Sequence, residues 1–363
     1  MASSARQERF YFLDCVRALA AWLVIWDHVV AIWPAAAGHD LPIVAWMRTY
    51  VTGPMAIIQD FGWLGVVLFF LISGFVITHV TEREQPLEFL IKRIFRIYPM
   101  VACAVALAAI TGIGMTPDVG ATDVVRNILL LNYFSVPQIN LVGVAWTLAI
   151  EVLFYGLVFV ALVVPDRSLR LLLVLGCVLA ALTFCRSFGS SFFLVAANAA
   201  YVPFLVIGQV VYLGVYRREL SPGRTIAMLG LCFALIIYGL FTIHQSFLAP
   251  GNSYMVGVFQ ALVIFLLFLV LEPRLGPNPV VRLLADTSFG VYITHGTVGF
   301  LAFHLVLASA GAYAAIVAAL VATVVSAVLL HHAVEKPMTT LGRRLSRLVT
   351  RRQGVPAHAP SSS

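Results

Sequence analysis

Arg17 and His28 could carry chemistry, because both lie within the first long apolar stretch, Leu13 to Trp33. They are 11 residues apart. At about 100° per residue of an α-helix, this spacing places them on one face, about 16 Å apart along the axis. Guanidinium groups bind anions well, and an imidazole that titrates near neutrality can act as a general base. The pair therefore suits the path of a long anionic substrate.

A packing interpretation of the same residues stays open on spacing alone. Arg17 would then be an interfacial anchor paired with Asp14, and His28 a hydrogen-bonded packing residue. Asp27 precedes His28 and points about 100° away from it on a helix, so we expect Asp27 to face a neighbouring helix instead of orienting the ring. We count Asp27 among the residues of a substrate cavity.

A second polar stripe follows Trp146. Thr147, Glu151 and Tyr155 are spaced i, i+4, i+8 and share one helix face. An unpaired carboxylate inside a membrane is costly, so Glu151 needs an imidazole, a guanidinium or a proton of its own. We expect Glu151 to be catalytic, by charging or orienting His28 or by holding substrate, with Tyr155 in the same cavity. A structural tie between helices is the alternative.

Three further segments carry polar residues. Arg93 and Arg96 are i, i+3 neighbours between the second and third apolar stretches, where paired guanidinium groups suit phosphate. Ser73 and Gly74 interrupt an apolar helix, where small residues usually permit close packing. Ser288, Tyr292 and His295 share one face of a later helix. Ser73, Tyr292 and His295 complete the expected substrate cavity.

The elements that must position these residues are membrane-spanning helices. Of the 363 residues, 61% are hydrophobic and 11% are charged, whereas soluble domains are about a quarter charged. We predict an all-α, polytopic bundle of about ten spans, each needing roughly 20 apolar residues. The predicted spans are 13–33, 61–80, 98–115, 144–164, 171–186, 199–216, 226–243, 255–271, 283–307 and 312–333.

Basic residues predict the orientation of this bundle. With both termini in the cytoplasm, 20 of the 23 Lys and Arg residues lie inside, and only Arg48, Arg126 and Arg186 lie outside. We divide the chain into a membrane domain, 1–340, and a basic, partly disordered cytoplasmic tail, 341–363, held near anionic lipid. Pro337 is expected to end the last helix. The net charge of +7 therefore indicates membrane lipids and not nucleic acid, and the five cysteines lack metal-ligand spacing.

The order of these motifs resembles the acyltransferase-3 family of membrane O-acyltransferases. The resemblance extends from Leu13 to Pro337. The motifs that carry it are Leu13-Asp14 with Arg17 and His28, Phe69 to Phe75, Arg93 to Pro99, Trp146-Thr147-Leu148 with Glu151 and Phe154-Tyr155, Ser288 to Tyr292 with His295, and Glu335-Lys336-Pro337. Two positions depart modestly from the family pattern, namely Ala18, where Gly is usual, and Thr147, where Ser is common.

This resemblance implies an acyl-CoA donor, usually acetyl-CoA, and an acceptor hydroxyl on a surface glycan such as lipopolysaccharide or on a lipid-linked saccharide. It implies a multi-pass protein of the inner membrane, with His28 as the base and Arg17, Arg93 and Arg96 binding the donor. No metal cofactor is expected. Alternatives are a glycan transporter or flippase, a non-catalytic scaffold, and an acyltransferase for a small metabolite such as a macrolide.

Overall fold

The computed structural model describes residues 9–112, 119–243 and 252–352, and within them all regular structure is helical. The α-helices are α1 (Tyr11–Ile25), α2 (Trp33–Ala36), α3 (Pro42–Met47), α4 (Gly62–Thr81), α5 (Pro86–Thr111), α6 (Ala121–Ile128), α7 (Trp146–Ala161), α8 (Arg167–Phe184), α9 (Ser190–Ala199), α10 (Val202–Val211), α11 (Pro222–Thr242), α12 (Asn252–Leu271), α13 (Pro279–Thr294), α14 (Phe300–Leu330) and α15 (Lys336–Arg352). The π-helices are η1 (Trp26–Ile32), η2 (Arg48–Thr52), η7 (Tyr212–Tyr216), η9 (His295–Gly299) and η10 (His331–Glu335). The 3₁₀ segments are η3 (Gln59–Phe61), η4 (Leu131–Phe134), η5 (Gly143–Ala145), η6 (Cys185–Ser187) and η8 (Glu272–Arg274).

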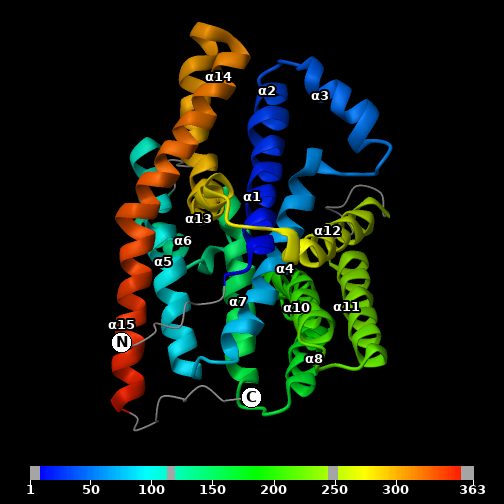
Figure 1. Cartoon of the computed structure of the whole chain (residues 1–363). Coiled ribbons are helices and arrows are strands. Elements are labelled where there is room, and N and C mark those ends of the chain that lie inside the picture. Colours follow the sequence, from blue (N-terminus) through cyan, green and yellow to red (C-terminus); the bar gives the residue numbers. More distant parts are fainter. Residues whose placement is uncertain (1–8, 113–118, 244–251, 353–363) are drawn as a thin grey trace.

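The expected multi-pass helical bundle is confirmed. Nine helical stretches within the described ranges are long and apolar enough to cross a membrane. The last of them, Pro279–Val349, is interrupted at Gly311, where φ is 81° and ψ is 175°. A left-handed φ suits glycine, which has no Cβ. The chain reverses there, at the top of α14 in Figure 1, so this stretch supplies both the ninth and the tenth predicted spans.

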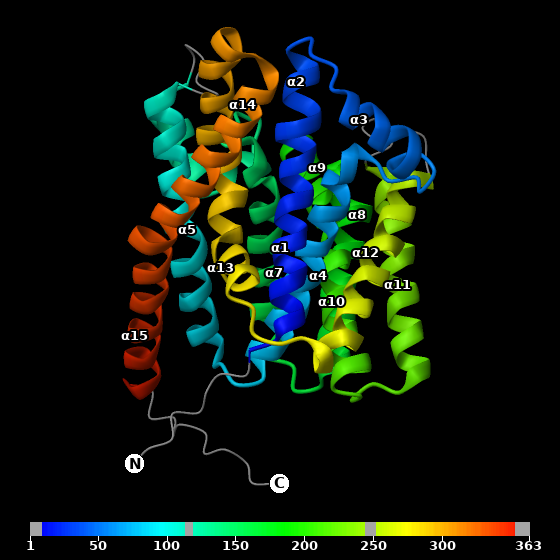
Figure 2. The same cartoon turned by 45° about the horizontal axis from the view of Figure 1, so that its top comes forward.

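Helix α1 lies in the middle of the bundle, where it contacts α4, α12 and α13 (Figure 2). Helices α5, α14 and α15 lie to one side of it, and α8, α10, α11 and α12 to the other. The first turn of α1 is held by Glu272, whose carboxylate accepts hydrogen bonds from the Tyr11 and Phe12 backbone N–H groups at 3.0 and 2.6 Å. A carboxylate is favourable at a helix N-terminus, so Glu272 fixes where α1 begins.

Glycines bring α4 and α10 into backbone contact. A Cβ on Gly74 would lie 1.7 Å from the Leu205 carbonyl oxygen, and a Cβ on Gly208 would lie 2.2 Å from the Leu71 carbonyl oxygen. No side chain fits at either position, so the two helices can meet this closely only with glycine. The close packing expected at Gly74 is therefore present, and it holds the neighbouring Ser73 in place.

Two elements differ from the sequence-based expectations. Arg93 and Arg96 were placed between spans, but they lie inside α5, which begins at Pro86 and continues through Pro99. Pro337 was expected to end the last helix and does not, because it is the second residue of α15. Proline lacks a backbone N–H but is tolerated in the first helical turn, and here the π-helix η10 precedes it.

Helix α15 runs through the predicted domain boundary at 340. Its small residues Gly342 and Ser346 are buried, and a Cβ on Gly342 would lie 2.7 Å from the Phe95 Cβ of α5. Small residues four positions apart allow this close approach between the two helices. Residues 353–363 of the predicted tail lie outside the described residues.

Candidate active site

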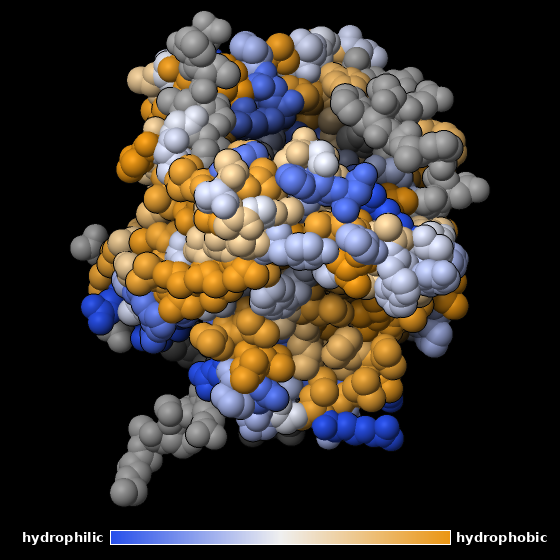
Figure 3. Space-filling view, turned by 90° about the horizontal axis from the view of Figure 1, so that it is seen from above, coloured by the Kyte–Doolittle hydropathy of each residue, from blue (hydrophilic) through white to orange (hydrophobic). Residues whose placement is uncertain are grey.

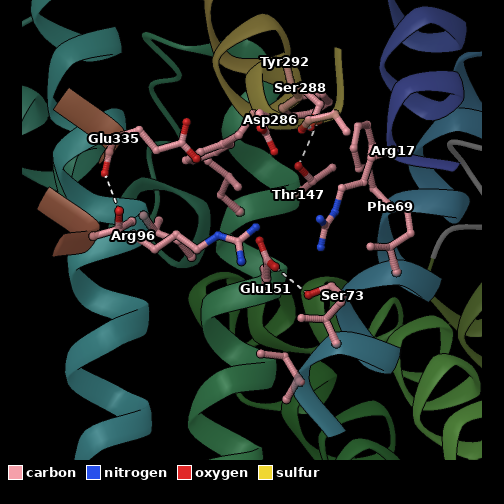
Figure 4. A pocket seen from close by; sticks show the side chains of 18 of the residues that line it. Arg17, Phe69, Ser73, Arg96, Thr147, Glu151, Asp286, Ser288, Tyr292 and Glu335 are labelled. Atoms are coloured by element: carbon pink, nitrogen blue, oxygen red, sulfur yellow. Dashed lines mark hydrogen bonds between the residues drawn. The ribbon is translucent and has the colours of Figure 1, made fainter. Parts of the chain in front are cut away.

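A cavity of about 480 Å³ lies among α1, α4, α5, α7, α13 and α15. This volume is within the range of sites that bind small molecules. Six of its polar lining residues were singled out from the sequence: Arg17, Ser73, Arg96, Glu151, Tyr155 and Tyr292. All of these except Tyr155 are labelled in Figure 4. Thr147 and Ser288 also line it. The polar face of α7 and the polar face of α13 therefore contribute to the same cavity.

Glu151 is held by hydroxyl groups. The Ser73 hydroxyl donates a hydrogen bond of 2.5 Å to Glu151 Oε1, and the Tyr155 hydroxyl donates to the same oxygen. Among the described residues, neither His28 nor His295 forms a hydrogen bond or ion pair with this carboxylate. Glu151 therefore satisfies its need for partners through α4 and its own helix, and the structure does not bring it to the ring of His28.

Two guanidinium groups flank this carboxylate. In Figure 4, Arg17 and Arg96 lie on either side of Glu151. Arg96 has no hydrogen bond or ion pair within 4 Å among the described residues, and Arg17 has one long contact, 4.0 Å to Asp14. Both groups are thus available for a phosphate or carboxylate ligand.

Arg93 has a different environment from Arg96. Its guanidinium lies over the Phe89 ring at 5.7 Å, is 3.8 Å from Glu84 and does not line the cavity. Residues three apart on a helix differ in direction by about 60°, which is enough to send one side chain into the cavity and the other into packing. Of the three arginines expected to bind the donor, Arg17 and Arg96 line the cavity and Arg93 does not.

The cavity lining carries further basic residues that were not among the site residues expected from the sequence. Arg282, Lys336 and Arg343 line the cavity. Arg282 is paired with Asp286 at 3.6 Å, and His331 Nδ1 lies 2.9 Å from a carboxylate oxygen of Glu335. In the part of the chain that the structure describes, Lys336 and Arg343 have no carboxylate within ion-pairing distance.

His28 and His295 lie together beyond the cavity. Their ring centroids are 5.0 Å apart, and each ring belongs to a π-helix, His28 to η1 and His295 to η9. His28 Nδ1 lies 3.0 Å from the Val24 carbonyl oxygen, and His295 Nδ1 lies 2.7 Å from that of Tyr292. A carbonyl oxygen can only accept, so each Nδ1 carries the proton in the neutral ring and each Nε2 is left with a lone pair.

His28 does not share the cavity lining with Arg17. The predicted common face assumed 3.6 residues per turn throughout, but η1 has wider turns from Trp26 onward. The His28 ring lies against that of His295 in η9. Trp33, which was not among the expected site residues, stacks on His295 with ring centroids 6.5 Å apart and an interplanar angle of 20°.

Asp27 lies outside the cavity lining as well. It is buried, its Oδ2 is 3.7 Å from His28 Nδ1, and its Oδ1 has no hydrogen-bond partner among the described residues. Gly62 packs against it so closely that a Cβ there would lie 2.1 Å from Oδ2. As expected, Asp27 faces a neighbouring segment and does not hydrogen-bond to the His28 ring.

A family model for an acyltransferase domain matches residues 10–332. The chain belongs to the acyltransferase-3 family. Comparisons with curated proteins and with solved structures gave no match. The cavity and the histidine pair are accordingly the candidate active site of a multi-pass membrane acyltransferase, and α15 adds to this site from outside the matched region.

Tyr292 connects the two parts of the acyltransferase site. It lines the cavity, and its ring centroid is 5.9 Å from that of His295. Its hydroxyl group donates to the Val144 carbonyl oxygen at 3.0 Å and lies 2.9 Å from the Thr147 hydroxyl. These bonds fix Tyr292 against the start of α7, between the cavity and the imidazoles.

Helices α1 and α13 run parallel in the acyltransferase and carry matching residues. At one end, Arg17 and Asp286 line the same cavity, and Arg9 hydrogen-bonds to Asp286 at 2.9 Å. At the other end, His28 meets His295. The paired helices therefore connect the cavity, lined by Arg17 and Asp286, with the two imidazoles.

Proposed function

We propose that this protein transfers an acyl group, in the simplest case acetyl, from acyl-CoA to a hydroxyl group of a cell-surface glycan or lipid-linked saccharide at the inner membrane. One observation carries the proposal. A single cavity is lined by the guanidinium groups of Arg17, whose contact with Asp14 is long at 4.0 Å, and Arg96, and by Tyr292, whose ring lies next to that of His295. The family supports the reaction type, and the multi-pass fold supports a membrane location.

The donor enters at the charged end of the cavity in this proposal. CoA carries its phosphates at one end and its thioester at the end of a long flexible arm. Arg17 and Arg96 bind phosphate oxygens, because guanidinium groups form strong charge-assisted hydrogen bonds with them. The arm then follows α13 past Phe289 to Tyr292, which brings the thioester carbonyl close to the imidazoles.

His28 acts as the general base. Its Nδ1–H is held by the Val24 carbonyl oxygen, which leaves Nε2 to accept the proton of the acceptor hydroxyl. The hydroxyl oxygen forms a bond to the thioester carbonyl carbon, and the carbon–sulfur bond breaks. CoA leaves as a thiolate and takes the proton back from His28, so an ester and a free thiol are formed and the imidazole is regenerated.

A purified-protein assay tests this role of His28. The wild-type chain in lipid nanodiscs receives labelled acetyl-CoA and, as acceptor, surface glycan from cells that lack the gene. His28→Ala should lower the rate of label transfer by about 10²- to 10⁴-fold, the usual contribution of a general base. His304→Ala is the matched control, because His304 is exposed on α14 and should leave the rate unchanged.

Other outcomes of this assay would point elsewhere. Wild-type turnover by His28→Ala would reject the base. A wild-type protein that consumes no acetyl-CoA would favour the transporter alternative, and label found only on small alcohols would favour a metabolite acceptor. Label retained on the protein when acceptor is withheld would make His28 an acyl carrier instead of a base.

A further inference from the structure

Helix α15 contributes to the cavity although it follows the part of the chain that matches the family model. Lys336, Thr339 and Arg343 line the cavity together with Arg96 of α5. They are spaced i, i+3, i+7 and so occupy one face of α15. Arg344, the next residue along the chain, does not line the cavity.

The packing of α15 fixes this face toward the cavity. Gly342 lies against Phe95, the neighbour of Arg96, and Ser346 is completely buried. Because Gly342 has no side chain, α15 approaches α5 closely at this point, and a residue with a Cβ there would clash with Phe95. Lys336 and Arg343 are thus held near Arg96 by the backbone of α15.

The charges around these two residues leave them free to bind an anion. Two acidic residues of the lining are already engaged, Glu335 by His331 at 2.9 Å and Asp286 by Arg9 at 2.9 Å. Among the described residues, Lys336 and Arg343 form no ion pair. The described lining carries five Lys and Arg side chains and three carboxylates, and this excess of positive charge favours a multiply charged anion.

We propose that Lys336 and Arg343 bind the nucleotide phosphates of acyl-CoA, so that α15 completes the donor site together with Arg96. The inference rests on the proposed function, since it assigns a ligand to the same cavity. The two ends of acyl-CoA would then lie in two regions of the cavity. The nucleotide is held by α15 and α5, and the acyl end is directed toward Tyr292. A basic tail that served only to attract anionic lipid would not need one face of the helix inside the cavity.

Direct binding of CoA tests this assignment without requiring turnover. The dissociation constant of CoA is measured for the full chain in nanodiscs of neutral lipid, with adenosine 3′,5′-bisphosphate as a competitor. Arg343→Gln and Lys336→Gln should each weaken CoA binding about ten- to a hundredfold, as expected for the loss of a hydrogen bond between charged groups. The same variants should reduce competition by the bisphosphate, and Arg343→Lys should restore most of the affinity.

Arg344→Gln is the matched control, because it removes the same charge from the adjacent position outside the cavity. It should change CoA affinity less than about twofold. Equal losses for Arg343→Gln and Arg344→Gln would overturn the proposal in favour of a general surface charge that attracts anions or lipid. Unchanged affinity in every variant would overturn it as well. A wild-type chain that does not bind CoA would instead refute the donor assigned under the proposed function.

Discussion

At the residue scale, the most informative difference is between Arg93 and Arg96. Their i, i+3 spacing suggested equal roles, and no sequence pattern indicated which one faces the cavity. Phe89 and Glu84 surround Arg93, whereas Arg96 lies beside Glu151. Which of the two arginines lines the cavity depends on how α5 is rotated against α7 and α15, and this rotation is a property of the packed bundle.

Arg96→Gln should raise the KM for acyl-CoA about ten- to a hundredfold, because a charge-assisted hydrogen bond contributes about 1.5–3 kcal/mol. Arg93→Gln should leave that KM within about threefold and lower the thermal stability instead. Initial rates over a range of donor concentrations and unfolding curves in detergent measure the two effects. Equal KM values for both variants would contradict the assignment of Arg96.

The spacing of Thr147, Glu151 and Tyr155 predicted one shared polar helix face, and all three residues line the cavity. The hydrogen bond from Ser73 to Glu151 was not predictable, because Ser73 belongs to another helix and lies 78 residues earlier in the chain. Glu151→Leu should lower the free energy of unfolding by about 1–3 kcal/mol, because two hydroxyl groups lose their acceptor. Glu151→Gln keeps an acceptor oxygen and should lose less. Thermal unfolding in detergent compares them, and equal loss in both variants would show that these hydrogen bonds do not matter.

At the element scale, the apolar stretches of the sequence located the membrane-spanning helices, because about 20 apolar residues in a row have few other folded states. They did not reveal the π-helices. The wider turns of η1 and η9 depend on local packing, and His28 in η1 meets His295 in η9. The sequence therefore identified both histidines but gave no sign that they form a pair.

Close contact of α4 with α10 gives a test at this scale. Gly74→Ala should destabilise the protein by about 1–3 kcal/mol or more, because overpacking forces backbone shifts and the new Cβ would meet the Leu205 carbonyl oxygen. Gly156→Ala is the control: nothing lies within 4 Å of its Cβ position, and alanine favours a helix over glycine. Tryptophan fluorescence during thermal unfolding compares the two. A similar melting temperature for Gly74→Ala and the wild type would contradict the described helix crossing.

At the scale of the whole molecule, basic residues from distant parts of the chain line one cavity. Arg17, Arg282, Lys336 and Arg343 line it together, and the orientation predicted from charge assigns all four to the cytoplasm. Figure 3 shows the opposite end, seen from above, where hydrophilic residues interrupt a hydrophobic surface. We propose that acceptor hydroxyl groups reach the histidine pair from this end.

Reporter fusions test the orientation. A fluorescent protein joined to the C-terminus should fluoresce, because it folds in the cytoplasm. Alkaline phosphatase inserted after Gly38 should be active, since this glycine lies in an exposed loop with open space around it and we expect that loop outside. The reverse pattern would place the charged end of the cavity outside the cell and exclude a cytoplasmic donor.

The central claim is that one protein carries an acyl group from a donor on one side of the membrane to a hydroxyl group near the other. It is tested most directly in proteoliposomes that contain labelled acetyl-CoA only in their lumen, with unacylated glycan added only outside. We expect labelled ester on the external glycan with the wild-type chain and almost none with His28→Ala. Label that appears only when donor and glycan share a compartment would contradict it.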